Sequence, residues 1–372
     1  MRIAVLDQSF HIKTGSFLFL LDLLRRLGTV DYFCVDIKDL AEVADGNYDV
    51  IILCQTECCG PYFLARGKRT VIVPMYDACA NMPEAYWRAM AGARVISFCQ
   101  KLHVRMLACG LDSIYLQYFP NPSTIKPVED FSNLRGFLWQ RSPREGFNWR
   151  LASRLCGLSL TSLHVHLAAD DNSNDRQMLP PDITTSEWGA DSSAYLAHMR
   201  KANVFFAPRA TEGIGMANLE AMAHGMCVIA HDDATANEYV RHQESGYLYD
   251  IGNPANLGLT PARAQQCGRA ARKTVEDGYK RYNERVDEVL AFISSTPKPD
   301  PRYRYQFPPN DFIRLARQIF ADAPGMQAIL TKAEGRGAFS ESLARIRRRV
   351  RRIPVLGPGA KAIYGWVREK DA

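Results

Sequence analysis

The chain of 372 residues has no apolar run long enough to cross a membrane as a helix. The best candidate, residues 17–24, is interrupted by Asp22 and falls well short of the about 20 apolar residues that a bilayer requires. The first seven residues, Met-Arg-Ile-Ala-Val-Leu-Asp, are typical of an opening β-strand and not of a signal peptide. We therefore expect neither a transmembrane segment nor a secretory leader.

Cysteine spacing excludes a second class of protein. The ten cysteines include one adjacent pair, Cys58-Cys59, and no C-x-x-C pattern. Several fall in apparent strands or helices, where a thiol acts as a small hydrophobic group. This distribution favours a reducing cytosol over a disulfide framework.

Length and pattern predict two α/β domains. The hydrophobic and charged fractions, 47% and 23%, are ordinary for a soluble globular protein, but 372 residues exceed what one core usually organises. Strands and helices alternate twice, and the break at Phe119-Pro120-Asn121-Pro122-Ser123 separates the two series. Such alternation predicts two doubly wound, mostly parallel sheets. The predicted segments are an N-terminal domain at 1–122, a second domain at 123–296 closed by a long helix, a helical extension at 297–340 and a tail at 341–372.

The tail is strongly basic. Nine of its residues are Lys or Arg and three are Asp or Glu, so it holds the whole formal net charge of +6. Apolar residues recur at helical spacing within the arginine run 345–352, which predicts an amphipathic helix on an anionic membrane surface. Nucleic acid is the rival partner, and a merely solvated helix is the plainest alternative. Tyr364 and Trp366 suit a headgroup interface and favour the membrane.

Residues 212–220, Glu-Gly-Ile-Gly-Met-Ala-Asn-Leu-Glu, are the most informative stretch. Two glutamates flank a turn broken by glycines, between an apolar run at 202–208 and a helical segment that stops at Gly225. An apolar strand follows at 226–230. A strand, glycine turn, helix and strand in this order place backbone N–H groups and a positive helix end against a phosphate.

The two carboxylates point to a ligand with hydroxyl groups at both ends. An ionised glutamate only accepts hydrogen bonds, so Glu212 and Glu220 suit the hydroxyls of a hexose and a ribose. Phosphates between them would lie on the N–H groups near Gly213, Ile214 and Gly215. This is the layout of a nucleotide sugar. The alternative is that Glu212 is a loop charge and Glu220 a solvated helix residue.

The flanking sequence resembles a known family. Glu-Gly-Ile-Gly, Leu-Glu-Ala-Met-Ala-His-Gly and the strand after them are similar to the signature of retaining GT-B glycosyltransferases of the family-4 type, which has an E-x7-E segment. About forty residues match in order, continuing through 237–240 and a hairpin-like stretch at 245–249. The resemblance covers roughly residues 1–293. It implies a GT-B architecture, in which two Rossmann-like domains face each other across a cleft.

The resemblance assigns roles in the second domain. It implies that Glu212 holds the donor sugar and Glu220 the ribose, with the diphosphate on the backbone of Gly213, Ile214, Gly215 and Met216. The loop at 139–146 resembles the strand end that supplies cations to the diphosphate, and Arg141 fits the first position. Further candidate cations are Arg144 and Arg209.

Matches in the first domain are weaker. Thr14-Gly15-Ser16-Phe17 resembles the family's glycine loop, which makes Gly15 a candidate near the donor phosphates and acceptor. Asp77 follows Tyr76, which stands where the family usually has histidine, and is the candidate for orienting or deprotonating the acceptor hydroxyl. A residue that caps the next turn is the alternative interpretation of Asp77. His11, a lone histidine near the glycine loop, is a further candidate to meet the acceptor.

The implied activity is transfer of a sugar, with retention, from a nucleotide sugar to a glycan or lipid-linked acceptor. The expected setting is bacterial cell-surface polysaccharide or lipopolysaccharide synthesis, with the protein cytoplasmic and peripheral on the inner face of the plasma membrane. No nucleic acid partner is expected. No cofactor or metal is expected either, because the chain has no D-x-D pair and His164 and His166 lack a third ligand.

Two other functions remain open from the sequence. Gly213-x-Gly215-x-x-Asn218 is close to a dinucleotide-binding fingerprint, which would suit an NAD(P)-binding oxidoreductase. The fingerprint follows a late strand instead of the first one. A non-catalytic GT-B scaffold docked at a membrane is the third hypothesis.

Overall fold

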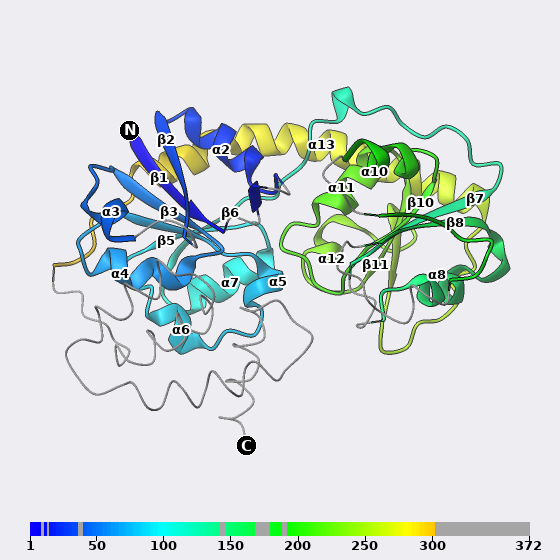
Figure 1. Ribbon diagram of the computed structural model, residues 1–372, viewed down its shortest axis with the longest axis horizontal. Coiled ribbons are helices and arrows are strands. Elements are labelled where there is room, and N and C mark those ends of the chain that lie inside the picture. The colour runs from blue at the N-terminus through cyan, green and yellow to red at the C-terminus, as the bar shows by residue number, and fades with distance from the viewer. Residues whose placement is uncertain are drawn as a thin grey trace, which may run out of the picture. The chain divides into compact units, whose positions relative to one another are not determined.

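A computed structural model describes residues 1–8, 11–12, 15–35, 40–141, 146–167, 179–187 and 192–301. The chain forms two compact units (Figure 1). Among the described residues, unit 1 contains those of Met1–Ser97, Lys101–Leu116 and 286–301, and unit 2 contains those of Phe98–Gln100 and Gln117–Arg285. Arg144, Thr14, the basic tail and nearly all of the predicted helical extension lie outside the described residues.

Unit 1 is built on a six-stranded parallel sheet with the order β2-β1-β3-β4-β5-β6. Its strands are β1 (Arg2–Asp7), β2 (Thr29–Cys34), β3 (Val50–Cys54), β4 (Thr70–Val73), β5 (Arg94–Ser97) and β6 (Asp112–Tyr115). Its helices are α2 (Leu18–Arg25), α3 (Leu40–Asp45), η1 (Glu57–Cys59), α4 (Gly60–Leu64), α5 (Tyr76–Cys79), α6 (Glu84–Arg88) and α7 (Gln100–Ala108), whose first residue is counted with unit 2. The central strand β3 is buried at all five residues, as a parallel strand covered on both faces requires.

Unit 2 repeats the plan with the order β12-β11-β10-β7-β8-β9. Its strands are β7 (Leu134–Gln140), β8 (Leu160–Leu167), β9 (Thr184–Glu187), β10 (Val204–Phe206), β11 (Cys227–His231) and β12 (Gly246–Tyr249). Its helices are η2 (Pro122–Thr124), α8 (Trp149–Cys156), η4 (Gly157–Ser159), α10 (Ser192–Met199), α11 (Met216–Ala223), α12 (Ala236–Tyr239) and most of α13 (Pro261–Ser294). After Arg285, α13 continues as part of unit 1.

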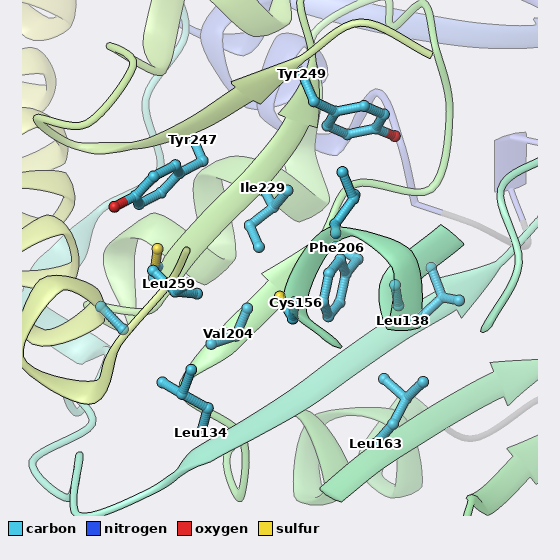
Figure 2. Close-up of a cluster of buried hydrophobic side chains, with 14 of the residues drawn as sticks. Leu134, Leu138, Cys156, Leu163, Val204, Phe206, Ile229, Tyr247, Tyr249 and Leu259 are labelled. Atoms are coloured by element: carbon cyan, nitrogen blue, oxygen red, sulfur yellow. The ribbon is translucent and has the colours of Figure 1, made fainter. Parts of the chain in front are cut away.

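The two faces of the second sheet bury different side chains. Leu134 and Leu138 of β7 join a cluster with neighbouring strands, α8 and the start of α13 (Figure 2). The alternate residues of β7 point the other way, because successive side chains of a strand face opposite sides. Phe137 and Trp139 accordingly pack against Tyr195 of α10, with ring centroids 5.3 and 5.4 Å away. Side chains of β7 therefore pack on both faces of the sheet of unit 2.

The predicted fold class is confirmed, and so are the elements around the glutamate signature. The strand, helix, strand series appears as β10, α11 and β11, and the long closing helix as α13. One expectation was wrong. The hairpin-like stretch at 245–249 is instead strand β12, which pairs in parallel with β11 after the crossover through α12. Strand β9 was missed, because its sequence, Thr-Thr-Ser-Glu, has no apolar residue.

Two negative expectations can be compared with the described part of the chain. In that part, the helices are all too short or too polar to span a bilayer. All ten cysteines lie within it, and none of them is joined in a disulfide. Nine of them are buried, in agreement with their predicted role as small hydrophobic groups.

Candidate functional site

The topology of unit 2 singles out the carboxyl ends of β7 and β10. Strand β7 has β8 on one side and β10 on the other, so the chain order reverses between β7 and β10. In open parallel sheets, ligands bind outside the carboxyl ends of the strands at such a switch point. Leu138 pairs with Phe206, so the segments beginning at Arg141 and Ala207 leave the sheet at neighbouring positions.

The segment after β10 forms a buried turn that begins α11. Residues 213–215 are buried, and Gly215 adopts φ +76°, a left-handed conformation that favours glycine. The first backbone bond of this helix in the i to i−4 pattern runs from the N–H of Leu219 to the carbonyl of Gly215, at 3.0 Å. The preceding N–H groups at 216–218 therefore belong to the helix terminus, where amides and the helix dipole favour an anion.

Side chains that follow β11 hold this turn in place. The Thr235 hydroxyl donates to the carbonyl of Glu212 at 2.7 Å, and the Thr211 hydroxyl donates to Asp233 Oδ2 at 3.2 Å. Thr235 itself has φ +76°, which is uncommon for a residue other than glycine. Backbone strain of this kind is tolerated where the surrounding structure fixes it, and it often marks functional sites.

The other end of α11 is also fixed, at Gly225 and α13. Gly225 adopts φ +69° just beyond the helix, as predicted for its stop signal. The guanidinium of Arg272 on α13 donates to the carbonyls of Ala223, Ile125 and Pro122. Helix α11 is thus positioned at both ends by contacts within unit 2.

Glu220 lies one turn into α11 and is half-buried. Burial raises the pKa of its carboxyl, and the nearby Arg200 partly offsets that shift. The pKa of Tyr118 rises to about 12, chiefly through burial, then through Tyr282 and Glu220. A partly desolvated carboxyl of this kind gains from hydroxyl donors supplied by a ligand.

Glu220 and Arg141 both affect the pKa of Tyr195. Burial raises the pKa of Tyr195; the charge of Glu220 raises it further, and Arg141 lowers it. The Arg141 guanidinium lies over the Trp139 ring, 4.6 Å from its centroid, and that ring contacts Tyr195. The charges of Arg141 and Glu220 therefore act on the same aromatic residue, although the two are far apart in the sequence.

The remaining predicted residues divide between the units. Glu212 and Arg209 are half-buried and lie in the segment between β10 and α11, together with the Gly213–Met216 backbone. Asp77 and Gly15 belong to unit 1: Asp77 is the second residue of α5, after β4, and Gly15 adopts φ +65° before α2. Arg144 lies outside the described residues. The roles given to these residues stay predictions.

Two histidines with an expected packing role are buried in unit 2. His164 stacks on His198 with ring centroids 4.0 Å apart and hydrogen-bonds Thr184 and Ser186. Burial, with the charge of His198, lowers the pKa of His164 and His166 to about 4, so both rings are neutral near pH 7. In the described ranges, no three His, Cys, Asp or Glu side chains are grouped to hold a metal.

Sequence reasoning missed one polar cluster in unit 1, formed by Asp7, His11 and Tyr32. Asp7 was interpreted only as the last residue of the first strand. Asp7 ends β1, so no helical spacing predicted its contact with His11. The partner Tyr32 comes from the next strand, and only the folded sheet brings it close.

Comparisons with known proteins agree with this geometry. Residues 188–281, which include the turn and α11, match the family model described as glycosyl transferases group 1. HepE of Anabaena, solved with UDP and glucose, is 16% identical with a TM-score of 0.57, over 78% of this chain and 100% of that one. Sucrose-phosphate synthase of Thermosynechococcus elongatus is 16% identical with a TM-score of 0.58, again over 78% of this chain and 100% of that one. The lipopolysaccharide outer core galactosyltransferase WaaB is 14% identical with a TM-score of 0.55, over 78% of this chain and 99% of that one. A search of curated protein sequences finds no match.

These similarities define the class of fold. The chain has two Rossmann-like domains with parallel six-stranded sheets, as in the GT-B proteins to which it is similar. The family match over 188–281 also supports a glycosyltransferase.

Proposed function

We propose that this protein is a metal-independent glycosyltransferase that moves a sugar from a nucleotide-sugar donor to a glycan or lipid-linked acceptor with retention of configuration. The observation that supports it most is that the segments with Arg141 and the glycine turn leave the sheet side by side at the switch point of unit 2, with Glu220 on the helix that the turn begins. The turn and Glu220 also lie within the segment that matches the group 1 model. A dinucleotide oxidoreductase has no comparable support.

The donor diphosphate would bind at the N-terminus of α11. The amides around Gly213, Ile214, Gly215 and Met216 and the guanidinium of Arg141 would stabilise the charge that grows on the leaving diphosphate; Arg209 and Arg144 are the further cations of this proposal. Fixed donors of this kind are often worth a few kcal/mol each in the transition state, because they need no rearrangement.

The two glutamates would hold the rings on either side of the diphosphate. Glu220 would accept hydrogen bonds from the ribose, which would satisfy a half-buried carboxylate whose nearby cation, Arg200, offsets only part of its burial. Glu212 would accept from the donor sugar. In this proposal, carboxylates bind the hexose and ribose hydroxyls, and N–H groups and arginines bind the diphosphate.

In the reaction, the acceptor oxygen would attack the anomeric carbon while the carbon–oxygen bond to the diphosphate breaks. The electron pair of that bond leaves with the diphosphate, and attack from the face of departure gives retention. We assign no protein nucleophile. Asp77, in unit 1, is the residue that we propose orients the acceptor hydroxyl.

The proposed setting is synthesis of a bacterial cell-surface polysaccharide or lipopolysaccharide. WaaB, one of the structural neighbours, is a lipopolysaccharide outer core galactosyltransferase. The basic segment 341–372 would hold the protein at the cytoplasmic face of an anionic membrane through its Lys and Arg side chains.

A panel of UDP-, GDP-, ADP- and TDP-hexoses tests the proposal, with nucleotide release measured in EDTA. We expect slow hydrolysis of one donor, and a kcat/KM about 10- to 100-fold lower in Glu220→Gln and Glu212→Gln, since each loses charge-assisted hydrogen bonds. The matched control is Glu244→Gln, an exposed glutamate paired with Arg241 in the same unit. Failure of the folded wild type to release nucleotide from any donor, together with binding of NADH in a fluorescence titration, would contradict the proposal.

A further inference from the structure

The loop after β11 holds the segment that precedes the glycine turn of unit 2. The hydroxyl of Thr211 donates to Asp233 Oδ2 at 3.2 Å, and the hydroxyl of Thr235 donates to the carbonyl of Glu212 at 2.7 Å. Strands β10 and β11 are neighbours in the sheet, which brings the segments that follow them together. Two consecutive residues before the turn are therefore fixed by one loop of the same unit.

Thr235 makes its bond from a strained backbone. It has φ +76° and ψ −59° and is completely buried. Positive φ is a genuine outlier for a residue with a branched β-carbon, whereas glycine adopts it readily. Among the residues that the structure describes, the other non-glycine residues with positive φ, Gln55 and Gln243, are unbranched at Cβ. The backbone of this position therefore favours glycine, and threonine supplies the hydroxyl that glycine lacks.

Helix α12, which follows Thr235, is anchored in the core of unit 2. Its Tyr239 is buried and packs against Phe119, with ring centroids 5.3 Å apart. Gln117 Nε2 donates to the carbonyl of Glu238 at 3.0 Å. Because α12 is anchored in this way, Thr235 is the fixed member of its hydrogen bond, and the segment before the glycine turn is the member that it positions.

The bond to the Glu212 carbonyl also determines where the N–H of Gly213 points. The two groups belong to one planar trans peptide, so they point in opposite directions. Gly213 is buried, and in the described part of the chain its N–H donates to neither a carbonyl nor a side chain. A buried N–H without a partner is costly, so this amide gains from an acceptor supplied by a ligand. With the carbonyl bound to Thr235, the N–H faces away from that loop.

The glycine at position 213 would allow this peptide to turn over. Such a turn changes ψ of the residue before the peptide and φ of the residue after it, as between β-turns of types I and II. The residue after the peptide then needs a positive φ, which glycine tolerates. Gly215 has a positive φ and Gly213 does not, so the peptide is in the orientation that the Thr235 hydroxyl stabilises. In the other orientation, the Glu212 carbonyl would replace the N–H and present an acceptor to an anion.

We propose that Thr235 is a positioning residue for the donor diphosphate: its hydroxyl keeps the peptide between Glu212 and Gly213 in the orientation that presents the N–H of Gly213 to the anion. This inference rests on the proposed glycosyltransferase function and adds a residue outside 212–220 to the donor site. The hydroxyl acts on a peptide and not on the Glu212 carboxylate. Its effect is therefore expected in the binding of a nucleoside diphosphate that carries no sugar.

The test is calorimetric titration of the full chain with the nucleoside diphosphate of the donor that the wild type hydrolyses fastest in the panel. Thr235→Val keeps the shape of the side chain but has no hydroxyl. We expect its Kd to rise about 10- to 100-fold, the usual effect of losing one hydrogen bond to a charged group. Thr235→Ser keeps the hydroxyl and should recover most of this loss. The matched control is Thr274→Val on α13, whose hydroxyl donates to the carbonyl of Ala270 at 2.9 Å in the same unit.

A second variant, Thr235→Gly, tests the hydroxyl without the strained backbone. Glycine adopts the φ of this position readily, so a folding defect from strain does not arise, and the Kd should rise as in Thr235→Val. The inference is overturned if either variant binds the nucleoside diphosphate within about threefold of the wild type, or if Thr235→Ser or Thr274→Val binds as weakly as Thr235→Val. A folded wild type that releases nucleotide from no donor overturns the glycosyltransferase proposal itself, which is a distinct result.

Discussion

The two units of the chain share one sheet plan but end their central strands with opposite chemistry. At the switch point of unit 2, β7 and β10 lead to arginines and a turn whose glycine is left-handed. At the switch point of unit 1, β1 leads to a buried carboxylate and its imidazole. The first set suits an anion, whereas the second is a hydrogen-bonded cluster around a carboxylate. The topology determines where on each sheet a ligand can bind, and the residues that follow the strands determine the chemistry of that position.

Two glutamates, one half-buried and one buried, show the same difference between the units. Glu220 in unit 2 has a raised pKa that Arg200 partly offsets, so a cation near the carboxylate supports its charged form. Glu57 in unit 1 is 6% exposed and has a pKa of about 7, and the groups that partly offset its burial are the Tyr86 hydroxyl and its own backbone. We infer that Glu220 is kept for a ligand and that Glu57 belongs to the core.

Replacing Arg141 should have the largest effect, because it removes the proposed cation from the site of unit 2. In Arg141→Met, loss of a fixed donor to the leaving diphosphate should lower kcat for nucleotide release about 10²- to 10³-fold. Initial-rate kinetics on the hydrolysed donor measure this, and Arg154→Met, on the exposed side of α8, is the control. An equal loss in the control, or an unchanged kcat in Arg141→Met, would remove Arg141 from the site.

Glu57→Gln tests the core role in unit 1. Its pKa rises from 4.5 unfolded to about 7 folded, so its contribution to stability is complete below about pH 4.5 and is lost as the pH rises through about 7. The variant cannot ionise. We therefore expect its free energy of unfolding, relative to wild type, to increase by up to about 3 kcal/mol from pH 4.5 to 8.

Urea unfolding at the two pH values measures this difference. Glu84→Gln, an exposed glutamate on α6, should show the same difference from wild type at both. A constant difference for Glu57→Gln as well would mean that Glu57 ionises normally in the folded protein.

The smallest effect is expected for Gly215→Ala. A control at Gly225 separates its cost in stability from its effect on UDP binding. Gly215→Ala places a side chain at φ +76°, which costs about 1–2 kcal/mol, and its Cβ would lie 3.2 Å from Asn218 Nδ2. Gly225→Ala, at φ +69° beyond the other end of α11, should cost a similar amount. Calorimetric titration with UDP should show weaker binding only for Gly215→Ala. Equal affinity in both variants would place the diphosphate elsewhere.

Local patterns were enough to predict much of unit 2. The apolar run at 204–206, the glycines at 213, 215 and 225 and the helix between them follow from propensity and turn chemistry, which act over a few residues. The polar strand β9 and the pairing of β12 were not predictable in this way, because both depend on neighbouring strands supplied by the rest of the sheet.

The amino-acid sequence by itself determined the class of fold, the glycine turn and the identity of its flanking glutamates, since these depend on short-range spacing. Only the tertiary structure decided that the charges of Arg141 and Glu220 both act on Tyr195, and that Asp7 is sealed between His11 and Tyr32. Residues distant in the chain become neighbours through parallel strand pairing and crossover helices. Burial, which shifts the pKa values, exists only after that assembly.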